Sequence, residues 1–135
     1  MTRYLAGTAA LLLVCTPAVA QSPQTLWVMF APESIALDDS ATSQLQRFAV
    51  DLGARHVIIR GRADPSEGRE ADVDDLSQRR ATIVHEHLQA YGVSVQRMTV
   101  GASDSSTPAG NPEDAGQNRR VEVIAYTPSH RRPPR

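Results

Sequence analysis

The sequence predicts an α+β two-layer sandwich, with two helices packed on one sheet in the order β-α-β-α-β-β. The chain has 135 residues, which allows one domain plus segments that are removed or disordered. Hydrophobic residues make up 41% and charged residues 21%, a composition typical of a globular protein. Short β-prone runs alternate along the chain with stripes of apolar residues at helical spacing. Because helices connect the early strands, the order favours parallel pairing of those strands.

Residues 1–20 are typical of a secretory signal peptide. Arg3 supplies the positive charge, Leu5–Cys15 form a short apolar core, and Ala18–Ala20 form a small-residue cleavage site. The apolar run is shorter than the roughly 20 residues that span a bilayer. A lipoprotein acylated on Cys15 is the alternative, but Val14 stands where such signals have a small residue. The sequence therefore predicts an exported protein.

The first half of the exported part contains two predicted strands around one helix. Residues 26–30 form a short apolar run that predicts the first strand. Asp38 and the residues after it cap a helix whose apolar positions recur over residues 41–52, and Gly53 ends the pattern. Residues 56–61 predict the second strand, which Gly61 ends.

The second half begins with a polar stretch over residues 62–75, followed by a helical stripe over residues 76–91. Residues 97–100 predict a third strand, and residues 102–117 have the composition of a surface loop. Residues 119–126 alternate between polar and apolar side chains, which indicates a half-buried strand. The tail, residues 127–135, is predicted to be disordered and basic, so the domain itself spans residues 21–126. The expected core side chains are Phe30, Leu45, Phe48, Leu52, Val84 and Leu88.

Composition and spacing argue against several classes of function. The formal net charge of -1 gives no electrostatic reason to expect a nucleic-acid partner. His85 and His87 are two residues apart and so lie on different faces of a helix, and the acidic stretch Glu67–Asp75 lacks the ligand order of a calcium loop. Neither Ser77 nor the pair Ser105-Ser106 has a nearby histidine with a plausible orienting acid in the pattern. We therefore expect no catalysis, no metal and no cofactor.

Two groups of residues resemble the signatures of the OmpA-like peptidoglycan-binding domains, the type found in OmpA, peptidoglycan-associated lipoprotein and MotB. The first group is Gly61-Arg62-Ala63-Asp64, then Gly68, then Leu76-Ser77-Gln78-Arg79-Arg80-Ala81. The second group is Gly101, Asn111, Gly116 and Asn118-Arg119-Arg120-Val121-Glu122. The resemblance covers nearly all of residues 26–125 and implies two helices packed on one mixed sheet. It also implies a periplasmic protein associated with the cell wall, with the outer membrane as an alternative place of association.

The family's ligand is the diaminopimelate of the peptidoglycan stem peptide, whose free end carries an ammonium and a carboxylate on one carbon. The resemblance implies that Asp64 accepts hydrogen bonds from the ammonium, while Arg80 holds the carboxylate through paired N–H bonds. It places both residues beside a crevice at the strand ends, where the first turn of a helix favours an anion. Leu76, Asn118 and Arg119 match further family positions at the same place, so they complete the predicted binding site.

Three departures from the family pattern keep a second function open. Ala63 replaces the usual threonine, and the segment between Asp64 and Leu76 is one residue longer. Val73 stands at the position of the family's asparagine, with Asp72 beside it. The alternative hypothesis is a protein-interaction module on the same fold that has lost wall binding, with envelope proteins as partners. An envelope hydrolase has the least support.

Overall fold

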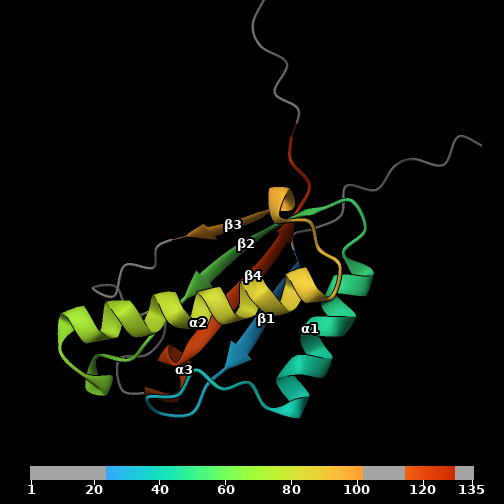
Figure 1. Cartoon of the computed structure of the whole chain (residues 1–135). Coiled ribbons are helices and arrows are strands. Elements are labelled where there is room, and N and C mark those ends of the chain that lie inside the picture. Colours follow the sequence, from blue (N-terminus) through green and yellow to red (C-terminus); the bar gives the residue numbers. More distant parts are fainter. Residues whose placement is uncertain (1–23, 102–114, 130–135) are drawn as a thin grey trace, which may run out of the picture.

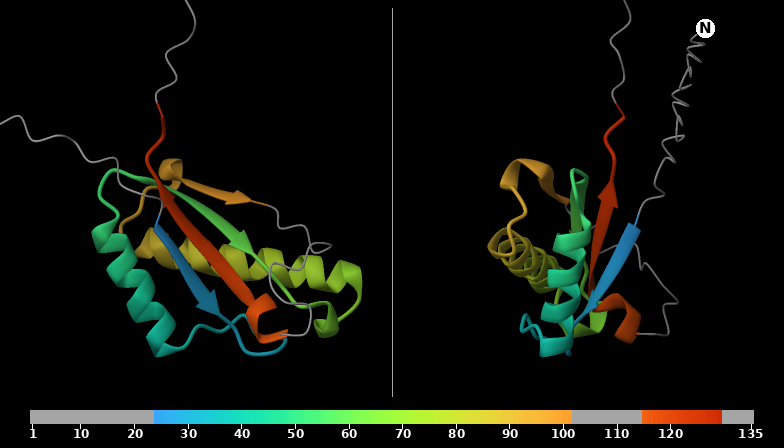
Figure 2. Two further views of the ribbon diagram at one scale, coloured as in Figure 1. Left: turned by 180° about the vertical axis from the view of Figure 1, so that it is seen from behind. Right: turned by 90° about the vertical axis from the view of Figure 1, so that its right-hand side faces the viewer.

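Four strands form one mixed sheet, and two long helices cover the same face of it (Figures 1 and 2). The computed structural model describes residues 24–101 and 115–129. The strands are β1 (Gln24–Met29), β2 (His56–Gly61), β3 (Met98–Gly101) and β4 (Arg120–Tyr126). The helices are α1 (Asp39–Asp51), α2 (Glu70–Ala90) and the short α3 (Ala115–Asn118), with single 3₁₀ turns η1 (Pro65–Glu67) and η2 (Val95–Arg97). The predicted α+β two-layer sandwich is confirmed.

The last strand lies in the middle of the sheet. The strand order is β1-β4-β2-β3, with β4 antiparallel to both of its neighbours and β2 parallel to β3. The predicted parallel pairing of the early strands is therefore confirmed for β2 and β3, which α2 connects. It is wrong for β1 and β2, which do not pair because β4 lies between them. Three inward-facing residues of β4, Val121, Val123 and Ala125, are fully buried. A strand with such a face gains most from the centre of a sheet, because both neighbours and the helices then cover it.

Helix α1 begins after a capping aspartate and is followed by a glycine, whereas α2 begins after Arg69 without a side-chain cap. Asp38 caps α1 by accepting a hydrogen bond from the Ala41 N–H at 2.7 Å, and Gly53, with φ of 60°, follows its end. The start predicted for the second helix was wrong, because α2 begins at Glu70 rather than at residue 76. Its first turn carries Glu70 and Asp72, whose negative charge is favourable there, and Val73 extends the buried stripe backwards.

The core lies between the sheet and the two long helices. Phe30, Leu45, Phe48, Leu52, Val84 and Leu88, the predicted core side chains, are all buried at 5% exposure or less, so that prediction is confirmed. Strand residues Val57 and Ile59 meet them from the sheet with no exposed surface. Full burial of one such side chain contributes about 1.5–3 kcal/mol.

Some predictions fall partly or wholly outside the described residues. The signal peptide, residues 1–20, lies outside them, as do residues 102–114 of the predicted loop and residues 130–135 of the predicted tail. At its far end the predicted loop was wrong, since residues 115–117 belong to α3. Residues 127–129 form neither helix nor strand.

Candidate functional site

The residues of the first signature meet at the end of β2, where α2 passes close to the strand. A Cβ atom on Gly61 would lie 1.8 Å from the Ser77 carbonyl oxygen, so only glycine permits this approach. The chain after β2 then turns through Asp64 into η1. Asn118, the last residue of α3, donates from its side chain to Asp64, and Arg119 follows it directly before β4. Close packing of β2 on α2 therefore determines where the candidate site forms.

Asp64 is a buried carboxylate that three donors hold in place. Its side chain is 5% exposed and caps η1, with Oδ2 accepting from the Ser66 N–H at 2.9 Å and from the Ser66 hydroxyl. Oδ1 accepts from Nδ2 of Asn118 at 2.8 Å. Burial raises the pKa of Asp64, but the bonds from Ser66 and Asn118 and the charge of Arg119 outweigh it, so the pKa lies below its ordinary value. Asp64 is therefore ionised at neutral pH.

Asn118 presents an acceptor that has no partner among the described residues. Its side chain is 3% exposed, and its amide nitrogen must face Asp64 because an ionised carboxylate only accepts. The amide oxygen Oδ1 therefore points away from Asp64, and within residues 24–101 and 115–129 nothing donates to it. A buried acceptor without a donor costs about 1–3 kcal/mol. Next to a carboxylate, such an oxygen suits a ligand that carries several N–H donors.

Arg119 follows Asn118 directly and is half-buried. Its Nε donates to the Phe30 carbonyl oxygen at 3.3 Å. The structure gives its two terminal amino groups no partner in the described parts of the chain. Its positive charge is near enough to Asp64 to lower the pKa of that carboxyl. Asp64, Asn118 and Arg119 therefore place a carboxylate, an amide oxygen and a guanidinium side by side.

Arg80 is fully buried, and all of its donors are used within the chain. Its Nε donates to the Ser34 carbonyl at 2.9 Å. Nη1 donates to the Arg62 carbonyl at 3.2 Å and to Glu67 Oε2 at 2.9 Å. Nη2 donates to the Ala31 carbonyl at 3.2 Å and to Glu67 Oε1 at 2.6 Å. An arginine side chain has five N–H groups, so none is left over in this arrangement.

Glu67 is a site residue that the sequence analysis missed. Its side chain is 3% exposed, and besides Arg80 it accepts from the Asp64 N–H at 2.7 Å and from the Glu33 N–H at 2.8 Å. Burial raises the pKa of Glu67, but the hydrogen bonds and charge of Arg80 and the two backbone donors outweigh it and lower the pKa. The spacing of Asp64 and Glu67 is that of a capping box, which was the available signal.

The predicted site residues thus divide into two groups. Asp64, Asn118 and Arg119 lie together, while Arg80 reaches Asp64 only through the carboxylate of Glu67. Leu76 lies one turn before Arg80 on α2 and is half-buried. Of the two residues near the family's asparagine position, Val73 is buried in the core side of α2 and Asp72 is exposed beside Gly68.

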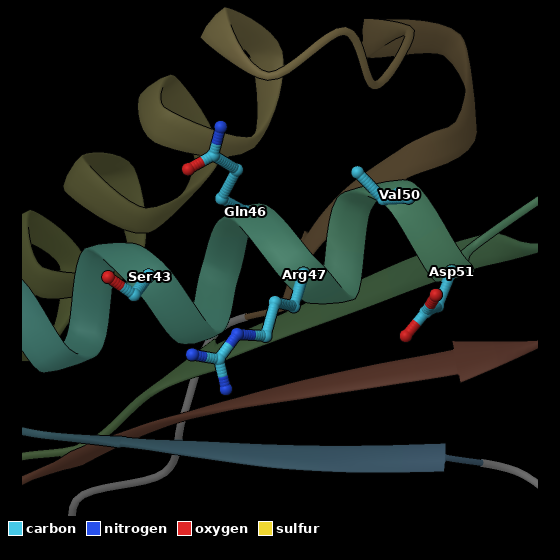
Figure 3. Close-up of a pocket in the computed structure, with 5 residues that line it drawn as sticks. All are labelled: Ser43, Gln46, Arg47, Val50 and Asp51. Carbon is cyan, nitrogen blue, oxygen red and sulfur yellow. The ribbon is translucent and has the colours of Figure 1, made fainter.

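The rest of the described structure offers few other places for chemistry. An open hollow of about 440 Å³ lies along α1, and Figure 3 shows Arg47 extending from it toward β1. A second hollow of about 200 Å³ lies between α1 and β1. None of the predicted site residues lines either one. Among the described residues no group of His, Cys, Asp or Glu is arranged to hold a metal ion, and none of their helices is long and apolar enough to span a membrane.

The fold and the arrangement of both signatures define an OmpA-like domain. The model of the OmpA family matches residues 29–127, so the chain belongs to the OmpA family, and the predicted resemblance is confirmed.

Individual relatives agree with this assignment. The chain is 35% identical over 111 residues to the peptidoglycan-associated lipoprotein of Legionella pneumophila, which covers 77% of this chain and 62% of that protein. The crystal structure of the peptidoglycan-associated lipoprotein from Burkholderia pseudomallei is similar, with 28% identity, a TM-score of 0.66, and coverage of 73% of this chain and 88% of that chain. The cell wall anchor of the T6SS from Pseudomonas aeruginosa shares the fold at 23% identity and a TM-score of 0.65, covering 78% of this chain and 82% of the other. The chain spans less than two thirds of the length of the curated relatives that it matches.

Proposed function

We propose that this protein binds peptidoglycan without altering it chemically, through the diaminopimelate of the stem peptide, as an exported protein of the periplasm. The proposal is supported by membership of the OmpA family and by two relatives whose names describe them as peptidoglycan-associated. The signal peptide expected at residues 1–20 supports export to the compartment that contains the wall.

The observation that carries the proposal is the pair of acceptors formed by Asp64 and Asn118. The free end of diaminopimelate carries an ammonium with three N–H donors and, on the same carbon, a carboxylate. In the proposed complex the ammonium donates to Asp64 and to the amide oxygen of Asn118, which supplies the missing partner of that buried oxygen. The carboxylate lies toward the arginine side of the site. Leu76 and Arg80 stay proposed members of the site, with Leu76 offering apolar contact to the ligand's carbon chain.

The expected affinity of a single site is modest. Each charge-assisted hydrogen bond contributes roughly 1.5–3 kcal/mol, and the loss of ligand freedom offsets much of that. The single-site dissociation constant is then on the order of micromolar to millimolar. Because the wall is a dense polymer of identical sites, rebinding holds the protein there more strongly than one site would.

Co-sedimentation with purified peptidoglycan sacculi tests the proposal. We expect the wild-type protein to pellet with sacculi, free meso-diaminopimelate to release it, and Asp64→Asn to remain in the supernatant. Asp75→Asn is the matched control, because Asp75 is an exposed acid of α2 with only a 3.9 Å contact to Arg79. The proposal fails if the wild-type protein does not pellet. Release of muropeptides from the sacculi would contradict its non-catalytic part.

A protein-interaction module that has lost wall binding is the second candidate. The observation in its favour is the carboxylate of Glu67 in the guanidinium fork of Arg80, since the signature arginine then has no N–H left for a ligand. It predicts no pelleting with sacculi, together with stable capture of an envelope protein whose binding does not depend on Asp64.

A further inference from the structure

The carboxylate of Glu67 pairs with the guanidinium of Arg80 in the geometry expected of a bound ligand carboxylate. Its two oxygens face Nη1 and Nη2 at 2.9 and 2.6 Å, which is the paired arrangement that a guanidinium makes with a carboxylate ligand. The remaining donors of Arg80 are used by backbone carbonyls of three different residues, Ala31, Ser34 and Arg62. The ring of Phe30 packs against the same guanidinium, with its centroid 5.2 Å from Cζ.

A ligand carboxylate could reach Arg80 only by displacing Glu67. The displaced carboxylate would lose two bonds to Arg80 and would have to leave a place where it is 3% exposed and also accepts from the N–H groups of Glu33 and Asp64. Separating the partners of a buried ion pair is strongly unfavourable, because it leaves an uncompensated charge. The ligand would gain no more bonds than Glu67 gave up. Replacement of Glu67 by a ligand carboxylate at Arg80 is therefore unfavourable.

Arg119 is a second guanidinium at this end of the sheet, where Arg62 and Arg120 both contact Glu122, and its terminal amino groups have no partner among the described residues. Its Nε donates to the Phe30 carbonyl at 3.3 Å, while the Phe30 N–H donates to the Arg119 carbonyl at 2.8 Å. These two bonds hold the backbone of Arg119 and the Nε end of its guanidinium. Both terminal amino groups remain without a partner among residues 24–101 and 115–129. Arg119 directly follows Asn118, whose amide donates to Asp64 in the proposed ammonium site.

We infer that Glu67 keeps Arg80 as an internal structural pair, and that Arg119 is the residue that recognises the carboxylate of the ligand. The inference rests on the proposed function and reassigns one of its contacts. Asp64 and Asn118 take the ammonium, Arg119 takes the carboxylate, and Arg80 acts as a positioning residue through Glu67, whose carboxylate also holds the N–H of Asp64. The ligand class is then an amino acid head group with a free carboxylate.

Two stem peptides separate this inference from the proposed function. One is L-alanyl-γ-D-glutamyl-meso-diaminopimelate, and the other is the same peptide with the free-end carboxylate converted to a carboxamide. We expect wild-type protein to bind the carboxylate form roughly tenfold or more tightly than the amide form, measured by calorimetric titration, because a charge-assisted pair is lost. In Arg119→Gln the ratio falls toward one: the carboxylate form binds about tenfold more weakly, and the amide form binds as it does to wild type.

Binding of the amide form serves as the control for folding of the Arg119→Gln variant. Arg47→Gln is a second control, because Arg47 is an exposed arginine of α1 to which the described structure gives no hydrogen bond or ion pair. Glu67→Gln gives an independent reading. If the ligand carboxylate normally displaced Glu67 from Arg80, this variant would bind the carboxylate form more tightly than wild type does; we expect no such gain.

Each result has a single meaning. If wild type binds neither peptide nor sacculi, the proposed function fails and the inference with it. If wild type binds sacculi and both peptides, but Arg119→Gln keeps the full preference for the carboxylate form, the inference alone is overturned. A gain of affinity for the carboxylate form in Glu67→Gln would also overturn it.

Discussion

Arg80 and Arg119 both contact Phe30, and they differ in how many of their N–H groups have an acceptor within the described chain. Arg80 is fully buried and donates to Glu67 and to three carbonyl groups, so every N–H has an acceptor. Arg119 is half-buried and has one hydrogen bond, from Nε, among the described residues. The first arginine joins the loop after β1, the loop after β2 and helix α2. Arg119 has two terminal amino groups without an acceptor among the described residues, so these groups can contact a ligand.

The same contrast divides the acidic groups. Glu67 accepts from two amino groups of Arg80 and two backbone N–H groups, whereas Asp64 lies beside an amide oxygen that has no donor among the described residues. A group whose hydrogen bonds are complete stabilises the fold, and a group left incomplete in a buried place suits a ligand. We therefore separate a structural pair, Glu67 and Arg80, from the proposed binding group, Asp64, Asn118 and Arg119.

Replacing Arg80 should give the largest effect on stability. Arg80→Ala leaves the buried carboxylate of Glu67 without its cation and three carbonyls without a donor, so we expect the free energy of unfolding to fall by about 3–5 kcal/mol. Urea denaturation followed by circular dichroism measures it. Arg79→Ala, at an adjacent exposed position, should change stability by less than about 0.5 kcal/mol. A similar denaturation midpoint for both variants would contradict the division between the two groups.

Low pH should have the next largest effect on stability, because it protonates Glu67 and so breaks its ion pair with Arg80. The ordinary pKa of Glu67, 4.5, is lowered in the fold, so its ionised form adds stability that is complete above that value and is lost as the pH falls through the folded pKa. We expect Glu67→Gln to be less stable than wild type at neutral pH. The difference between their free energies of unfolding should narrow once the pH drops below about 4.5. Asp64, whose pKa is also lowered from 3.8, contributes in the same direction at slightly lower pH.

Thermal denaturation of both proteins over the range from about pH 3 to pH 7 measures this gap. Asp75→Asn, which removes an exposed acid, should run parallel to wild type. A gap that stays constant across the range would show that ionisation of Glu67 does not stabilise the fold.

Removal of the Asn118 amide should have the smallest effect on stability. Asn118→Ala loses one hydrogen bond to Asp64 but also removes an oxygen that is buried without a donor, so the two effects offset and the change should stay within about 1 kcal/mol. Its binding to sacculi should nevertheless weaken. A loss of stability as large as that of Arg80→Ala would place Asn118 in the structural group instead.

Much of the candidate site could be predicted because it lies in contiguous signatures. Asp64, Arg80, Asn118 and Arg119 were identified because they match positions of the family's signatures. Glu67 was missed because it lies in an acidic stretch, Glu67–Asp75, in which residue type alone does not distinguish one acid from another. Only contact with α2 and with the loop after β1 distinguishes it from its exposed neighbours Glu70 and Asp72.

By itself the sequence determined the family, through its two signatures. It also determined the order of most elements and the residues of the core, since these depend on periodicity and local capping. The tertiary structure alone decided that β4 separates β1 from β2, because strand order depends on pairing between residues far apart in the chain. It also decided which arginine is internally paired. That outcome depends on the hydrogen bonds that Glu67 accepts from the Glu33 N–H, 34 residues away in the sequence, and from the Arg80 guanidinium, 13 residues away. Local sequence pattern carries no information about contacts over such separations.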